Sequence, residues 1–147
     1  AVGKVVLYSP TIDVTDGAAV LKANAFQHIA IADPKAAPYG AAGMAVLDKL
    51  GLTDAVTPKI VTGENITQTQ QFVDSGSAEL GFVALSQVVG KPATQVWLAP
   101  QEEYPAIKQN AVLLKVGEAN QAAKDFLNYL KSDEAVAVIK AAGYTLE

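Results

Sequence analysis

Short apolar runs alternate with longer segments of mixed polarity along this chain, and that order predicts an α/β protein with a largely parallel sheet. The short runs are apolar at nearly every position, which is typical of strands buried on both faces. We expect strands at residues 4–8, 29–32, 58–61, 80–84, 96–98 and 109–116. The longer segments predict helices at residues 18–23, 38–50 and 65–75, and two amphipathic helices between residues 123 and 142.

Two of these helices begin just after a predicted strand. Pro38 suits a first helical turn, because the backbone N–H that proline lacks has no partner inside the helix. The N–H groups of Tyr39 and Gly40 are therefore expected to be free at a helix end where the macrodipole is positive, which favours an anion. Asn65 is a favoured N-cap for the next helix, and Gln68 lies at the capping-box position. Since ligands of open α/β sheets bind beyond the carboxyl ends of the strands, we expect both helix ends to face one cleft.

Residues that favour helix ends also occur in the C-terminal third of the chain. Ser132 is the expected N-cap of the last helix, and Gly143 is expected to end it, with Tyr144 placed for a Schellman-type contact. Both C-terminal helices have apolar stripes that need an apolar partner.

Composition narrows the possible partners of this 147-residue chain. The net charge is −4 and there is no basic run, which disfavours nucleic acid and anionic membranes. There is no cysteine, so disulfides and thiolate metal sites are impossible. His28 is the only histidine, and Asp33 with Glu64 is the one conceivable carboxylate pair; neither forms part of a catalytic constellation. We expect no metal site and no enzyme activity.

Several motifs resemble one family. The stretches AIADPK (residues 30–35), APYGAA (37–42), GENI (63–66) and GFVALS (81–86) are similar to segments of periplasmic molybdate-binding proteins of ABC importers, which are type II solute-binding proteins. FLNYLKS (126–132), followed by Glu134-Ala135 and Gly143-Tyr144, resembles a C-terminal signature of the wider superfamily.

The resemblance implies a periplasmic-binding-protein-like fold whose two lobes enclose molybdate or tungstate, without another cofactor. Residues 1–108 would be the second lobe with a crossing strand, and residues 109–147 the C-terminal part of the first lobe. The oxyanion donors would be the N–H groups of Tyr39 and Ile66, supported by Pro38, Gly40 and Asn65. Some members have a tyrosine donor where this chain has Ala84, so the Tyr39 hydroxyl is a candidate replacement. The implied location is the periplasm, and the implied partner is an ABC permease.

In that family the serine and threonine ligands of the first lobe lie upstream of the matched region. The resemblance therefore implies a fragment, which we expect to bind oxyanion weakly and to self-associate. The surfaces expected to associate are the apolar faces of the C-terminal helices and open edges of the strands at residues 4–8 and 109–116.

Other functions remain open at this stage. The fold can also serve as the ligand-sensing effector domain of a transcription regulator, and the anion could be sulfate or phosphate. The sequence does not rank molybdate above tungstate.

Overall fold

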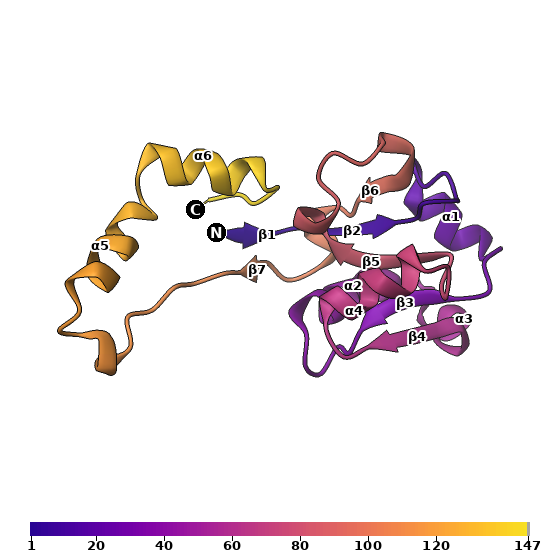
Figure 1. Ribbon diagram of the computed structural model, residues 1–147. Coiled ribbons are helices and arrows are strands. Elements are labelled where there is room, and N and C mark those ends of the chain that lie inside the picture. Colours follow the sequence, from indigo (N-terminus) through magenta and orange to yellow (C-terminus); the bar gives the residue numbers. More distant parts are fainter. Residues whose placement is uncertain (147) are drawn as a thin grey trace.

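The computed structural model describes residues 1–146. Figure 1 shows a sheet covered by helices, and a separate C-terminal group of helices joined to it by two adjacent strands. The strands are β1 (Val2–Gly3), β2 (Val5–Tyr8), β3 (Ile29–Ala32), β4 (Ile60–Gly63), β5 (Leu80–Ala84), β6 (Val96–Leu98) and β7 (Ile107–Lys108). The helices are α1 (Gly17–Ala23), α2 (Pro38–Lys49), α3 (Thr53–Val56), α4 (Ile66–Asp74), α5 (Gln121–Tyr129) and α6 (Asp133–Ala141), with short 3₁₀ turns between elements.

The main sheet has five strands in the order β4-β3-β5-β2-β6. Strand β3 is parallel to β4 and β5, whereas β2 is antiparallel to both of its neighbours, β5 and β6. The sheet is therefore mixed, with two parallel and two antiparallel pairings, which confirms the predicted α/β fold class. The expectation that residues 4–8 present an open edge is wrong, because β2 has a paired strand on each side.

Alternate residues of the central strands face opposite layers, as the strand period of two requires. Ile29 and Ile31 of β3 pack in one core cluster with Val46 of α2. Ala30, between them, belongs to a second cluster with Val73 of α4. Helices α2 and α4 therefore cover opposite faces of the sheet.

Strands β1 and β7 form a separate two-stranded ribbon, with Gly3 opposite Ile107. Figure 1 shows this ribbon between the main sheet and the C-terminal helices. The chain returns to it after α6, where the N–H of Val2 donates to the carbonyl of Thr145 at 2.7 Å. The ribbon therefore receives both ends of the C-terminal segment.

The strand predicted at residues 58–61 begins later than expected. Pro58 lies in a 3₁₀ turn (Thr57–Lys59), and the strand begins only at Ile60. The Lys59 ammonium holds this turn by donating to the carbonyls of Asn24 and Phe26 at 2.8 and 2.7 Å. Proline cannot donate to a ladder, so the strand starts after it.

Residues 109–116 were expected to form a strand, and this is wrong. After β7 the N–H of Gln109 donates to the carbonyl of Ala1 at 2.7 Å, and no described strand continues the pairing. Val112 and Val116 are 78% and 93% exposed. An extended segment without a neighbouring strand has no ladder to join, whatever its side chains favour.

The C-terminal helix ends agree with their predicted signals. The Ser132 hydroxyl accepts from the N–H of Ala135. Gly143 has φ of +86°, and the N–H groups of Gly143 and Tyr144 donate to the carbonyls of Lys140 and Ile139. This pair of bonds is the Schellman motif. Glu147, the last residue of the predicted first-lobe segment, lies outside the described residues. None of the described helices has the length and hydropathy of a membrane span.

Candidate functional site

The first turn of α2 starts at the carboxyl end of β3. The carbonyl of Asp33 accepts from the N–H groups of Ala36 and Ala37 at 3.1 and 2.8 Å, which turns the chain into the helix. Ala37 is the N-cap residue, without a side-chain cap, and Pro38 is the first helical residue. The N–H of Tyr39 has no acceptor among the described residues, as expected.

Gly40 differs from the prediction. Its N–H is not free, because it donates to the carbonyl of Ala37 at 3.0 Å. A Cβ at this position would overlap the carbonyl oxygen of Ala32 at the end of β3. Gly40 therefore supports the site sterically, since it allows the helix to begin directly against the strand end.

The start of α4 is capped as predicted, with one difference. The Asn65 side chain accepts from the N–H of Gln68 at 2.9 Å. The Gln68 side chain in turn accepts from the N–H of Glu64 at 2.6 Å, one residue before the N-cap residue of a standard capping box. The N–H of Ile66 is left without an acceptor among residues 1–146.

These two helix ends lie at the same edge of the sheet. Strands β3 and β4 are parallel neighbours, and their last residues, Ala32 and Gly63, are paired in register. The N–H of Asp33 donates to the carbonyl of Gly63 at 2.7 Å, so the two chains leave the sheet side by side. The arrangement therefore brings Tyr39 and Ile66 to one edge, although their helices cover opposite faces.

Gln87 contributes to this edge, and sequence reasoning missed it. Its amide nitrogen donates to the carbonyl of Ile66 at 3.1 Å, and its amide oxygen accepts from the N–H of Ala84 at 3.0 Å. Gln87 therefore fastens the first turn of α4 to the end of β5. A glutamine shortly after a buried strand carries no such signal by itself.

The Tyr39 side chain points elsewhere than was expected of a ligand donor. It is 8% exposed, and its hydroxyl is buried without a hydrogen-bond partner among the described residues. A Cβ at Gly3 would overlap this hydroxyl, so the phenol ends against the β1–β7 ribbon. The role of this hydroxyl as a replacement for a tyrosine donor at Ala84 therefore stays a prediction, which its place in this structure does not support. Burial, and then the neighbouring Tyr144 phenol, raises the pKa of Tyr39 to about 12.

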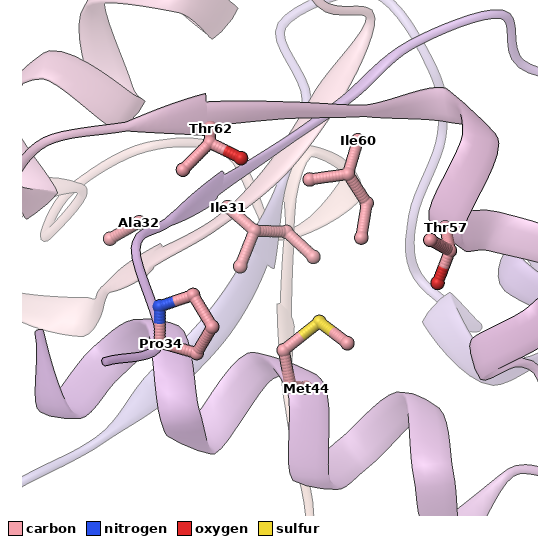
Figure 2. A pocket seen from close by; sticks show the side chains of 7 residues that line it. All are labelled: Ile31, Ala32, Pro34, Met44, Thr57, Ile60 and Thr62. Atoms are coloured by element: carbon pink, nitrogen blue, oxygen red, sulfur yellow. The ribbon is translucent and has the colours of Figure 1, made fainter. Parts of the chain in front are cut away.

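Two cavities lie next to α2. One, of about 250 Å³, is mostly apolar and has hydroxyls only from Thr57 and Thr62; Figure 2 shows Met44 rising from the helix toward Ile31 and Ile60. The other, of about 490 Å³, separates the first turn of α2 from residues 105–109 and includes Pro38 and Gln109 in its lining. Neither cavity is lined by Ile66. Among residues 1–146 no group of three or more His, Asp or Glu side chains is arranged to hold a metal ion.

Comparison with known proteins places this geometry in context. The molybdate-binding protein ModA of Rhodobacter capsulatus is 50% identical over 148 residues, a match that covers 100% of this chain and 58% of the relative. ModA of Azotobacter vinelandii is 53% identical over 151 residues, covering 100% and 60%. The chain thus spans less than two thirds of the length of these relatives.

A solved structure gives the same picture. The periplasmic molybdate-binding protein of Azotobacter vinelandii superposes with a TM-score of 0.91 at 41% identity, covering 100% of this chain and 66% of that one. The family described as bacterial extracellular solute-binding protein matches residues 2–145. Since that match extends over nearly the whole sequence, the chain belongs to the bacterial extracellular solute-binding protein family.

Proposed function

We propose that this chain supplies one wall of a binding site for a tetrahedral oxyanion, molybdate or tungstate. The observation that carries the proposal is the pair of helix ends at adjacent, parallel strand ends, each with an unpaired N–H group, at Tyr39 and Ile66. The names and the overall identity of the relatives support molybdate as the ligand. Tungstate is included because it is a tetrahedral dianion like molybdate.

The chemistry of such a wall suits a dianion. Backbone N–H groups at helix N-termini carry a partial positive charge, and they donate hydrogen bonds without needing a lysine or arginine. The net charge of −4 is therefore no obstacle to anion binding. Pro38, Gly40 and Asn65 act as supports, because they set where each helix begins.

The division of the chain follows from the same proposal. Residues 1–108 form the second lobe with the crossing strands, and residues 109–147 belong to the first lobe. The separation of α5 and α6 from the main sheet in Figure 1 supports this division. The opposing hydroxyl ligands would come from the part of the relatives that this chain does not span.

The biological setting is import. We infer a substrate-binding role, without catalysis or a cofactor, in the periplasm and with an ABC permease as partner. Two relatives that match the whole chain are named molybdate-binding proteins, and the protein of the superposed structure is described as periplasmic.

Calorimetry on the full gene product that contains this sequence tests the proposal. We expect molybdate and tungstate to bind far more tightly than sulfate, because donors spaced for the larger ions leave a smaller tetrahedron under-bonded. Each lost hydrogen bond to a charged group costs about 1.5–3 kcal/mol. Phosphate should also bind weakly, since its proton meets a donor. Equal affinities for sulfate and molybdate would refute the proposal.

A further inference from the structure

The Tyr39 hydroxyl is an exception to a general rule. Buried polar groups in proteins nearly always have a hydrogen-bond partner, so an unpaired one calls for an explanation. Here the phenol is 8% exposed and its oxygen has no partner among residues 1–146. The side chains of Tyr144 and Gln109 are close enough to act on its pKa, but neither makes a hydrogen bond of good geometry to it.

The position of this hydroxyl is defined by the ribbon. It lies against Gly3 of β1, which pairs with Ile107 of β7. A Cβ on Gly3 would overlap the hydroxyl oxygen and come within 3.0 Å of the Tyr39 Cζ atom. The phenol can occupy this place only because residue 3 is glycine.

The two ends of Tyr39 thus contact different parts of the molecule. Its backbone is the second residue of α2, with an unpaired N–H at the sheet edge. Its ring reaches Gly3 of the β1–β7 ribbon. Figure 1 shows that ribbon between the main sheet and the C-terminal helices. The ring is rigid and buried, so a displacement at Gly3 acts on the Tyr39 side chain and, through it, on the first turn of α2.

We propose that Tyr39 is a positioning residue that couples the β1–β7 ribbon to the anion-binding end of α2. The inference rests on the proposed function, since it assumes that the Tyr39 N–H binds the oxyanion. The position of the ribbon then sets the position of a ligand donor.

The test uses three variants of the full gene product: Gly3→Ala, Tyr39→Phe, and the two combined. Gly3→Ala should weaken molybdate binding about tenfold or more, the effect of losing one hydrogen bond to a charged group. Tyr39→Phe alone is the reference for the double variant, because it measures how much the affinity depends on the hydroxyl itself. The double variant should recover most of the affinity, since the overlapping oxygen is gone.

Gly17→Ala is the matched control. A Cβ there would overlap the Trp97 ring, so the clash is of the same kind but involves neither the β1–β7 ribbon nor Tyr39. It should lower the melting temperature and leave the molybdate affinity of the folded protein unchanged. A loss of affinity in Gly17→Ala equal to that in Gly3→Ala would show a general effect of destabilisation and overturn the proposal.

Amide NMR tests the coupling through Tyr39 independently of the proposed binding function. In Gly3→Ala the resonances of Tyr39 and Gly40 should shift, and they should return toward their original positions in the double variant. If the unmodified protein does not bind molybdate, the proposed function fails, and these resonances still decide the coupling. Unchanged resonances in Gly3→Ala, or a double variant as perturbed as Gly3→Ala, would overturn the coupling.

Discussion

At the scale of single residues, the helix starts at the candidate site were predictable, whereas the free N–H expected at Gly40 and the side-chain environment were not. Pro38 and Asn65 mark helix starts through local chemistry, and the structure has them there. The contact of Tyr39 with Gly3 joins residues far apart in sequence, so no local pattern indicates it. Gln87 was missed for the same reason, because its partner Ile66 belongs to another element.

Gly40 gives a prediction at this scale. Gly40→Ala should destabilise the protein by about 1–3 kcal/mol, because the added methyl meets the backbone of β3, which cannot move as a side chain would. It should also weaken molybdate binding by displacing the first turn of α2. Urea denaturation and calorimetry measure the two effects.

Gly117→Ala is a suitable control for this change. Its added methyl would have only the Leu113 side chain nearby, at 3.3 Å. A change within about 0.5 kcal/mol is expected there. If Gly40→Ala lowers the free energy of unfolding no more than Gly117→Ala does, the close contact between α2 and β3 does not constrain the site.

At the scale of elements, a strand or helix was predicted correctly where the residues that fix its bounds lie within the segment or next to it. Strands β3 and β5 have the predicted bounds, because their apolar runs end at turns or polar residues. Residues 109–116 have comparable β propensity but do not form a strand, since strand formation requires a neighbour. Helix α6 needs no such neighbour for its ends, because Ser132 and Gly143 bond to its own backbone.

The cap of α4 gives the prediction at this scale. Asn65→Ala should cost about 1 kcal/mol of folding free energy, because the N–H of Gln68 loses its acceptor. Molybdate affinity should fall as well, since fraying of the first turn displaces the Ile66 N–H. Urea denaturation and calorimetry on the full gene product are the measurements.

Asn120→Ala removes the equivalent cap of α5, where the side chain accepts from the N–H of Ala123. Its stability cost should be similar or smaller, and its effect on molybdate binding negligible. Equal losses of affinity in the two variants would argue against a specific role of the α4 end.

At the scale of the whole molecule, the fold class was predictable from the order of elements, and exposed apolar faces on the C-terminal helices were predictable from their apolar stripes. Large apolar side chains of the C-terminal part are exposed, among them Leu114 at 64%, Phe126 at 59% and Val138 at 65%. A cavity of about 560 Å³ lies between α5, α6 and the start of the chain, lined in part by Leu127, Leu130 and Ile139. Faces of this kind on soluble chains tend to bind partners.

We therefore predict that the 147-residue chain, made alone, self-associates through residues 109–147 and binds molybdate weakly or not at all. The binding part follows because only the Tyr39 and Ile66 wall is encoded, so the anion stays largely hydrated. Light scattering over a range of concentrations should show dimers or larger species, and a combined Phe126→Lys and Val138→Lys variant should reduce them.

Val89→Lys is the control for this experiment, since Val89 is 51% exposed but lies outside residues 109–147. It should leave the association unchanged. A clean monomer at high concentration would contradict the prediction, and tight molybdate binding by that monomer would contradict its second half.

The place of β2 in the sheet has a kinetic consequence. It is the first strand of the main sheet along the chain, yet its two neighbours are β5 and β6 near the end of the sheet-forming region. Contacts between such distant segments are slow to form, because a long loop must close before they contribute. The side of the sheet that contains β2 therefore assembles late, and the apolar segment Val5–Tyr8 must stay unpaired until the strands on both sides of it have been synthesised.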